Sequence, residues 1–424
     1  MIPPLYEHQK KIIKANRLKC GLFLGTGASK TRTALELAEG KTLVICPKQQ
    51  REDSTWEREN EKWGTKINLK VISKEDLRKD WESLPHFDSV IIDEVHNNLG
   101  ITPDFIQRKL IQYPKTSQIF AATKGYIDKH KPKRLYLLSA TPVPKPMSMW
   151  GIGILFGQHW DFAAFRQAYY FEIRMGCRRV WIPKKDELTR QRLATLIQKF
   201  GYTGSLNDFF DVPPQTHKTV LIDITGEQKK AIDNMTILEA DPLVRRARLR
   251  TIENGVLYGT KIKELEGKID QMTNMTTIFK SNKITYILER AQEFPKLLIY
   301  ANYTAQIEEI AKALRKAEYK VSVLNGATKD RSFIRRVDES PEPHIIVAQC
   351  SISSGYELPS FPCVIYASKS FRYVDYSQSL GRVLRANKLK KNLYIHLVVE
   401  GCDKDCHDAI MSGNDFMEKL TLNI

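Results

Sequence analysis

The stretch Leu22-Phe23-Leu24-Gly25-Thr26-Gly27-Ala28-Ser29-Lys30-Thr31 decides the fold. Its apolar start predicts a strand, its two glycines predict a turn, and residues 32–39 have the pattern of a helix. In this order of elements, the backbone N–H groups of the turn face one anion and the helix adds its positive end. The lysine would neutralise the β- and γ-phosphates, and the Thr31 hydroxyl would bind Mg²⁺. We therefore predict a nucleotide-binding phosphate loop formed by Gly25, Thr26, Gly27, Ala28, Ser29, Lys30 and Thr31.

Ser29 departs from the usual pattern of such loops, which has glycine directly before the lysine. Serine lacks the backbone freedom of glycine, but it can adopt helical dihedral angles and begin the helix. The alternative interpretation is a glycine-rich turn beside a solvated lysine. A second element is needed to choose between the two.

That element is Val90-Ile91-Ile92-Asp93-Glu94-Val95-His96, an apolar strand that ends in two adjacent carboxylates. At the carboxyl end of a parallel strand, Asp93 can hold Mg²⁺, and Glu94 can orient and deprotonate the attacking water. Standing alone, the pair would favour an exposed acidic turn. Because it follows the phosphate loop in the same α/β unit, it indicates nucleotide hydrolysis instead.

Short apolar runs alternate with helical patterns in two regions, as expected for helices around a parallel sheet. The expected strands are 21–24, 42–46, 69–72, 89–92 and 134–139 in the first region, and 297–300, 321–324, 344–348, 363–366 and 392–398 in the second. Between them, residues 151–280 lose this alternation, carry longer helical patterns at 187–200 and 226–237, and concentrate positive charge. We expect an α/β protein with two parallel-sheet domains, 1–150 and 281–424, and a mostly helical, basic insertion at 151–280.

The composition indicates which kind of molecule the protein binds. The chain has 424 residues, enough for two or three domains, and a formal net charge of +17, which attracts polyanions. Its apolar runs fall short of the roughly 20 residues needed to cross a bilayer. Seven scattered cysteines do not form the framework of a secreted disulfide domain, and Cys402, Cys406 and His407 supply only half of a zinc ligand set. Nucleic acid is the expected partner, with no membrane, metal-cluster or disulfide role.

Two further segments contain polar or charged residues that we expect near the nucleotide. Leu137-Leu138-Ser139-Ala140-Thr141-Pro142 places small hydroxyl residues at the end of an apolar strand, where they can hydrogen-bond the carboxylates. Near the other end of the chain lies Gln378-Ser379-Leu380-Gly381-Arg382-Val383-Leu384-Arg385. Arg382 and Arg385 are one helical turn apart, so we expect both guanidinium groups on one helix face, able to reach a phosphate bound by the first domain.

Together these residues resemble the superfamily 2 helicases and translocases, whose two RecA-like domains bind ATP between them. The resemblance implies that Tyr6, Gln9, His96 and Gln378 join the phosphate loop in binding ATP·Mg²⁺, with Thr31 and Asp93 at the metal. It implies catalytic roles for Lys30, Asp93, Glu94, Arg382 and Arg385. It also implies that Ser139, Thr141 and Gly355, the last within Ser353-Ser354-Gly355-Tyr356-Glu357-Leu358, couple hydrolysis to movement.

Finer features resemble the Swi/Snf-like branch, in particular the segments at 56–63, 223–228 and 280–283. Members of that branch commonly track along duplex DNA, and phage and bacterial relatives remodel branched DNA. We expect a monomer that acts on duplex, forked or branched DNA in the cytosol of a bacterium or phage-infected cell. Tyr356-Glu357 departs from its fifth motif. The arginines expected at DNA are Arg178, Arg179, Arg245, Arg246, Arg248 and Arg250, whose alternative role is to face solvent around a small helical core. Two other functions stay open: a DExH-type RNA helicase, and a non-catalytic DNA-binding module with a degenerate ATP site.

Overall fold

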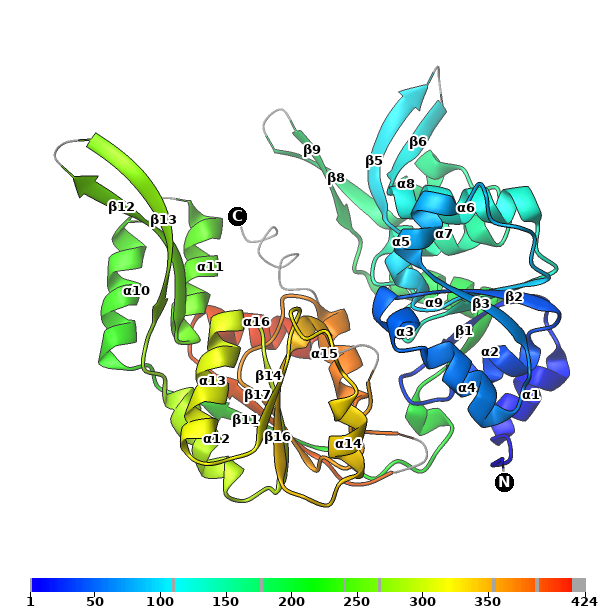
Figure 1. Cartoon of the computed structure of the whole chain (residues 1–424). Helices are drawn as coiled ribbons and strands as arrows, with labels where there is room; N and C mark the ends of the chain where they lie inside the picture. Colours follow the sequence, from blue (N-terminus) through cyan, green and yellow to red (C-terminus); the bar gives the residue numbers. More distant parts are fainter. Residues whose placement is uncertain are drawn as a thin grey trace. The chain divides into compact units, whose positions relative to one another are not determined.

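The computed structural model describes residues 2–108, 111–175, 178–238, 241–265, 268–352, 356–385 and 389–413. The chain divides into two compact units, Met1–Asp211 and Val212–Ile424, each built around its own parallel sheet (Figure 1). None of the helices in the described ranges is long and apolar enough to cross a membrane.

The first unit contains a six-stranded parallel sheet in the order β10-β1-β7-β4-β2-β3. The strands are β1 (Lys19–Leu24), β2 (Lys41–Cys46), β3 (Asn68–Ser73), β4 (Ser89–Ile92), β7 (Arg134–Leu138) and β10 (Gly201–Gly204). All four residues of β4 and all five of β7 are buried, because helices cover both faces of the sheet. The carboxyl ends of β1, β7 and β4 therefore lie side by side, and the three predicted motifs of this unit follow these strands.

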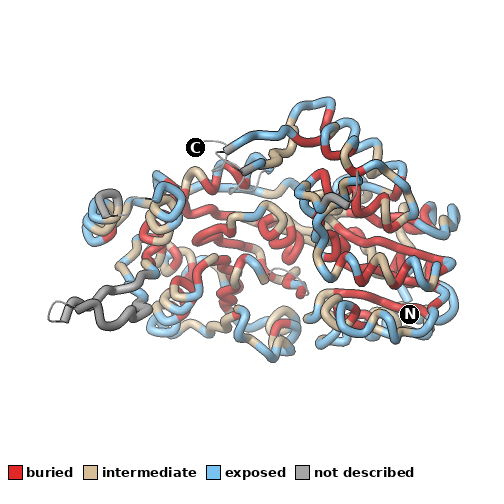
Figure 2. Tube along the Cα trace, turned by 90° about the horizontal axis from the view of Figure 1, so that it is seen from above, coloured by how far each residue is buried: buried red, intermediate tan, exposed pale blue. Residues whose placement is uncertain are grey.

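The helices of the first unit are α1 (Glu7–Ala15), α2 (Lys30–Leu37), α3 (Lys48–Glu52), α4 (Thr55–Trp63), α5 (Lys74–Asp80), α6 (Gln118–His130), α7 (Pro146–Leu155), α8 (Phe162–Tyr169) and α9 (Glu187–Phe200). Two 3-10 turns, η1 (Val95–Asn98) and η2 (Leu206–Asp208), follow β4 and β10. Apolar residues of β2, β4 and β7 form the core with those of α6 and α7, and the buried strands lie inside a layer of more exposed helices (Figure 2).

The second unit repeats this plan with the order β11-β18-β17-β14-β16-β15, again all parallel. The strands are β11 (Thr216–Leu221), β14 (Lys296–Ala301), β15 (Val321–Leu324), β16 (His344–Gln349), β17 (Cys363–Tyr366) and β18 (Leu393–Val398). The helices are α10 (Gly226–Leu238), α11 (Pro242–Glu253), α12 (Asn282–Ala291), α13 (Thr304–Lys316), α14 (Phe333–Glu339), α15 (Tyr373–Leu380) and α16 (Cys402–Met411), with the 3-10 turn η3 (Cys350–Ile352).

Helix α13 shows how the sequence pattern sets the packing. Ile307, Ile310, Ala311 and Leu314 recur at helical spacing, so they form one apolar face, and all four are fully buried against the sheet. The ten predicted strands are all present, with bounds within two residues of those expected.

The stretch 151–280 is divided between the two units. Residues 151–211 belong to the first unit, where β10 extends its sheet, and residues 212–280 belong to the second, where β11 does the same. The helices expected at 187–200 and 226–237 are α9 and α10. The stretch also contains two antiparallel hairpins, β8 (Tyr170–Met175) with β9 (Arg178–Pro183), and β12 (Val256–Leu265) with β13 (Lys268–Ile278). A third hairpin, β5 (Ile101–Arg108) with β6 (Ile111–Thr116), lies within the first unit.

Candidate active site

The predicted phosphate loop joins β1 to α2 at the carboxyl edge of the first sheet. Gly25 donates its N–H to Gly204 O at 2.7 Å, so the loop starts against the end of β10. A Cβ on Gly25 would lie 3.2 Å from the Cα of Ser205, which explains glycine at this position. Gly27 has φ +84°, a left-handed conformation that glycine adopts at little cost.

Ser29 is also left-handed, with φ 58° and ψ 36°, where helical dihedral angles were expected. This conformation is strained for a residue with a Cβ, which accounts for the glycine found at this position in most such loops. Three hydrogen bonds hold the residue, because Ser29 O accepts from Thr33 N at 3.2 Å, from Thr33 Oγ1 at 3.0 Å and from Gln9 Nε2 at 3.4 Å. The loop therefore keeps its shape without the glycine.

Lys30, the first residue of α2, turns back across the loop. Its Nζ donates to Leu24 O at 2.8 Å and to Gly25 O at 3.1 Å. The ammonium group is thus held directly over the turn whose N–H groups would face a phosphate.

Asp93 and Glu94 follow β4 and are both buried. Asp93 N donates to Ile45 O at 2.8 Å, which ties the carboxylate to the neighbouring strand β2. Burial and the Glu94 charge raise the pKa of Asp93 to about 6, while Lys30 opposes this shift. Glu94 is left-handed with φ 47°, a backbone strain typical of functional sites.

A chain of polar contacts connects Glu94 to the end of β7. His96 Nδ1 lies 3.4 Å from Glu94 Oε2 and shares a hydrogen bond of 3.0 Å with Ser139 Oγ. Ser139 Oγ in turn accepts from Thr141 N at 3.0 Å. The Ser139 hydroxyl was expected to bond the carboxylates directly, but it bonds His96 Nδ1 instead, and the same nitrogen lies near Glu94.

Gln9, expected at the nucleotide, is fully buried beneath the phosphate loop. Its Oε1 accepts from Tyr6 N at 3.0 Å, and its Nε2 donates to Thr33 Oγ1 at 3.2 Å as well as to Ser29 O. The structure thus brings Tyr6 and Gln9 to the loop and gives Gln9 contacts that fix the loop's conformation.

The sequence reading missed an aromatic group beside these residues. The His8 ring stacks on Phe209 with centroids 4.2 Å apart, and Phe210 packs edge-on against Tyr6 at 4.8 Å. His8 Nε2 also lies 3.3 Å from Ala28 O in the loop. Phe209 and Phe210 follow β10, an edge strand whose sequence Gly201-Tyr202-Thr203-Gly204 lacks the apolar pattern of a strand. The sequence therefore did not predict that these two rings lie beside residues 6–9.

Gln50 is a second residue that the sequence reading missed. Its side chain hydrogen-bonds the carboxylate of Asp93 and thereby lowers the pKa of Asp93, and its Oε1 accepts from Trp56 Nε1 at 3.2 Å. The fully buried Trp56 ring of α4 therefore fixes the amide that orients the carboxylate.

The residues at this edge fit a magnesium ion. Mg²⁺ takes oxygen ligands, and Asp93 supplies a buried carboxylate while Thr31 supplies a hydroxyl at the start of α2. One carboxylate oxygen, Asp93 Oδ1, accepts from Glu94 N at 2.8 Å. The same carboxylate lies near the ammonium of Lys30, which would also meet the phosphates.

Arg382 and Arg385 do not share a helix face, contrary to expectation. Helix α15 ends at Leu380, and both arginines lie beyond Gly381. The buried Arg382 donates to Gln378 O at 3.0 Å and to Tyr356 O at 2.9 Å, so it joins the run 378–385 to the fifth motif. Arg385 pairs with Glu357 at 3.2 Å. Gln378 is buried on α15, and Gly355, Ser353 and Ser354 lie outside the described residues.

The arginines expected at nucleic acid divide into two groups. Arg179 is exposed on β9, and Arg245, Arg246 and Arg248 are partly exposed on α11. The side chain of Arg178 lies outside the described residues.

Arg250, by contrast, is 1% exposed, so the expectation that it binds DNA is wrong. Its guanidinium donates to Lys369 O at 2.5 Å and lies 3.5 Å from Asp403. Lys283 binds the same carboxylate at 2.7 Å. Arg250 and Lys283 therefore anchor α11 and α12 to α16 inside the second unit.

The cysteines and His407 fill structural positions. Six cysteines of the described ranges are buried free thiols. His407 Nδ1 shares a 2.7 Å hydrogen bond with Lys369 Nζ, and among the described residues no cluster of three or more His, Cys, Asp or Glu is placed to hold a metal.

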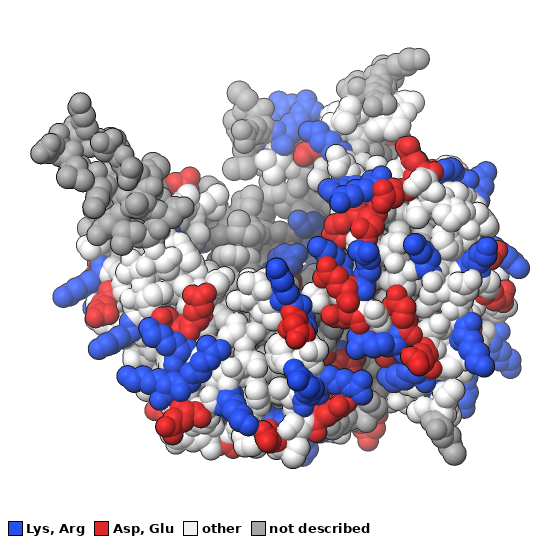
Figure 3. Space-filling view, in the orientation of Figure 1, with Lys and Arg blue, Asp and Glu red and all other residues white. Residues whose placement is uncertain are grey.

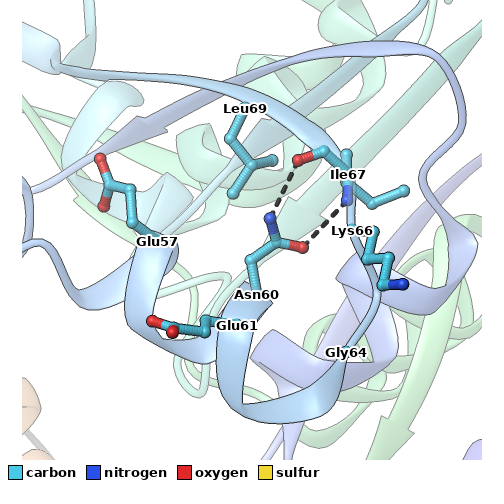
Figure 4. Close-up of a pocket in the computed structure, with 7 residues that line it drawn as sticks. All are labelled: Glu57, Asn60, Glu61, Gly64, Lys66, Ile67 and Leu69. Carbon is cyan, nitrogen blue, oxygen red and sulfur yellow. Dashed lines mark hydrogen bonds between the residues drawn. The ribbon is translucent and has the colours of Figure 1, made fainter.

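A surface pocket of about 360 Å³ lies elsewhere in the first unit, against α4 and β3 (Figure 4). Asn60 spans it, accepting from Ile67 N at 3.1 Å and donating to Ile67 O at 2.9 Å. Glu57, Glu61 and Lys66 also line it, and none of the predicted site residues does. We do not place the active site there, because the phosphate loop and the carboxylates lie at the sheet edge.

Comparison with known proteins gives one family match. Residues 279–387 match the helicase conserved C-terminal domain. This match confirms the predicted resemblance to superfamily 2 helicases and the predicted enzyme class, a nucleic-acid-stimulated ATPase, which implies the use of ATP.

Two solved structures are also similar to the chain. One is the SWI2/SNF2 ATPase core of Sulfolobus solfataricus in complex with dsDNA, at 18% identity and a TM-score of 0.40, with 99% of this chain and 95% of that chain covered. The other is the C-terminal part of the Fun30 ATPase domain, at 16% identity and a TM-score of 0.38, with 46% of this chain and 89% of that chain covered. No curated protein sequence matches the chain.

Proposed function

We propose that this chain is an ATP-dependent DNA translocase of the Swi/Snf-like branch that moves along or remodels duplex or branched DNA. The observation that carries the proposal is the polar chain from Glu94 through His96 and Ser139 to Thr141, next to the phosphate loop. It connects the carboxylate suited to activating water with a backbone segment after β7. A change at the γ-phosphate can therefore alter the position of that segment.

In the first unit, Lys30 neutralises the triphosphate, and the N–H groups of residues 25–31 surround it. Thr31 and Asp93 hold Mg²⁺, which would neutralise phosphate charge when bound. Glu94 orients and deprotonates the attacking water, and Tyr6 and Gln9 hold the nucleotide end of the loop. Ser139, Thr141 and Gly355 couple hydrolysis to movement.

From the second unit, Arg385 supplies positive charge to the transferring phosphate, while Arg382 and Gln378 hold the turn that carries it. An arginine in this role contributes about 10³ to 10⁵ in rate. Hydrolysis should therefore be slow without nucleic acid and faster with it.

The nucleic-acid partner is duplex, forked or branched DNA, bound mainly through its phosphates by a monomer in the cytosol of a bacterium or phage-infected cell. The net charge of +17, the exposed Arg179 and the partly exposed Arg245, Arg246 and Arg248 support this proposal. Backbone contacts of this kind give weak sequence preference and strong salt dependence.

The first experiment measures the ATPase rate without nucleic acid and with single-stranded DNA, duplex, forked DNA or RNA. We expect stimulation by duplex or forked DNA. Stimulation by RNA alone would instead favour an RNA helicase, and DNA binding without turnover would favour the non-catalytic module.

The site assignment is tested by Lys30→Ala, with Lys48→Ala as the control, since Lys48 is an exposed lysine of the same unit. Lys30→Ala should abolish hydrolysis and leave DNA binding intact, whereas Lys48→Ala should change neither. Unchanged hydrolysis in Lys30→Ala would remove the site assignment.

A further inference from the structure

Two antiparallel hairpins of the first unit both contact α8. The β5–β6 hairpin comes shortly after the Asp93-Glu94-Val95-His96 box, and β8–β9 begins where α8 ends. In Figure 1 both hairpins project from the sheet of this unit. Neither was expected from the sequence.

Arg166 of α8 joins the two hairpins. Its side chain is 4% exposed and donates to Gln112 Oε1 at 2.6 Å and to Pro103 O at 3.4 Å, both in the first hairpin. The guanidinium also lies 4.6 Å from the ring centre of Phe105 in β5 and 4.0 Å from that of Trp181 in β9. One buried cation thus contacts both hairpins, and its interactions hold them in a fixed relation.

The hairpin faces that point away from Arg166 are apolar and exposed. Ile106 lies opposite Tyr113, so these two side chains and Ile111 share one face of β5–β6, while Phe105 lies on the other. Phe171 and Ile173 share the corresponding face of β8–β9, because Trp181 lies opposite Glu172. The exposed fractions are 49% for Ile106, 57% for Ile111, 47% for Tyr113, 55% for Phe171 and 41% for Ile173.

The described side chains of the four strands carry a small excess of positive charge. They comprise three basic residues, Lys115, Arg174 and Arg179, against two acidic ones, Asp104 and Glu172, and Arg179 pairs with Glu172 at 3.4 Å. Figure 3 shows basic side chains gathered near the projecting end of β8–β9. Apolar side chains framed by cations suit a polyanion that also offers stacked bases.

The first hairpin is tied closely to the active site. Asn98, in the turn after the carboxylates, donates to Thr123 Oγ1 of α6 at 3.2 Å, and Leu99 and Ile101 are buried in the core. Ser117 N, just after β6, donates to Gly100 O at 2.6 Å. The base of the hairpin is therefore fixed to the segment that carries Asp93 and Glu94.

We propose that the two hairpins form one surface that binds DNA at a junction between duplex and single strand, where Ile106, Ile111, Tyr113, Phe171 and Ile173 contact the exposed bases. The proposal rests on the proposed function and names its substrate class. Arg166 is a positioning residue that sets the spacing of the two hairpins.

A protein partner fits this surface less well. A stable protein interface commonly uses about 20 to 30 residues a side. The exposed apolar set has five, divided between two narrow ribbons. One or two apolar side chains are enough to wedge into a base step, so the size of the surface matches bases better.

The test compares wild type with a double variant in each hairpin, Ile106→Ser/Tyr113→Ser and Phe171→Ser/Ile173→Ser. Leu188→Ser is the matched control, because Leu188 is a 54% exposed apolar residue of α9 in the same unit. Affinity and ATPase stimulation are measured with forked DNA and with blunt duplex of the same length. We expect each double variant to lose about tenfold in affinity for the fork, as base stacking is strong, and to keep its affinity for the duplex.

Equal affinity of wild type and both double variants for the fork would overturn the inference, and so would an equal loss on fork and duplex. Its failure differs from failure of the proposed function, in which no nucleic acid would stimulate wild-type hydrolysis. Arg166→Lys, which keeps the charge but cannot reach Gln112 and Pro103 together, should raise the KM for forked DNA and leave kcat unchanged. Unaltered KM would remove the positioning role.

Discussion

The guanidinium of Arg385 lies 3.2 Å from the carboxylate of Glu357, so two residues of the helicase domain neutralise each other. The Glu357 side chain is 59% exposed and that of Arg385 only 12%. Glu357 also belongs to the pair Tyr356-Glu357, which departs from the pattern expected for the fifth motif. Under the proposed function, this carboxylate would compete with a phosphate for the arginine.

We expect Glu357→Gln to raise the DNA-stimulated kcat, because Arg385 no longer has to leave a carboxylate to reach the phosphate. Exposed ion pairs contribute about 0.2–1 kcal/mol, so the increase should not exceed about fivefold. Steady-state hydrolysis at saturating DNA measures it, with Arg385→Ala as the inactive reference. A fall in kcat would mean that Glu357 itself acts on the nucleotide.

Ser29→Gly should stabilise the first unit. A left-handed conformation costs a residue with a Cβ roughly 1–2 kcal/mol, and glycine offsets part of this gain by losing about 0.5–1 kcal/mol more on folding. We expect a net gain of up to about 1 kcal/mol in urea denaturation, with hydrolysis at least as fast as in wild type. Ser29→Ala keeps the strain and should show no gain. A less stable Ser29→Gly would mean that the serine hydroxyl makes a needed contact.

Ser139→Ala removes the hydroxyl between His96 and Thr141. Nucleotide affinity should stay unchanged, because Lys30 and the loop remain, while stimulation of hydrolysis by DNA should fall by about tenfold, the loss of roughly one hydrogen bond of 1.4 kcal/mol. Binding of a fluorescent ATP analogue and DNA titration of the ATPase separate the two effects. Full stimulation of hydrolysis by DNA in Ser139→Ala would contradict the proposed coupling. Ser148→Ala, on α7, is the control.

Lys369 predicts a pH dependence of stability in the second unit. Burial lowers the pKa of Lys369 to about 7, so above that pH the folded state holds it neutral while the unfolded chain, with the ordinary pKa near 10.5, still binds the proton. The unfolded state therefore binds more protons, and stability should rise with pH above about 7, by up to about 1.4 kcal/mol per pH unit.

Thermal or urea unfolding between about pH 7 and pH 8.5 measures this slope. In Lys369→Met the slope should be smaller, since the group that takes up the proton is gone. An equal slope in the variant would assign the pH dependence to other groups.

The sequence predicted the sheets well because their central strands are fully buried and read as continuous apolar runs. It missed β10 and β11 because they are short edge strands with polar sequences, such as Gly201-Tyr202-Thr203-Gly204. The hairpins were missed for a similar reason, since their alternation mixes exposed apolar and charged residues and resembles a loop.

In the active site, sequence spacing located the phosphate loop and the carboxylates, because each follows a buried strand. The prediction that Arg382 and Arg385 share one helix face was wrong, because the helix ends at Leu380, before both residues. The prediction that Arg250 binds DNA was also wrong, because a run of arginines does not indicate which one pairs with a buried carboxylate. Contacts that join distant residues, such as Gln50 with Asp93, leave no local signal.

The shared carboxylate of Asp403 has a consequence for biosynthesis. Arg250 and Lys283 emerge from the ribosome long before the residue that neutralises both of them, and an unpaired buried cation is strongly unfavourable. The strands described for the first unit are complete once residue 204 is made, so this unit can fold during translation. The second must wait for the closing helix, and a nascent chain stalled before residue 403 would be left with an open, protease-sensitive half.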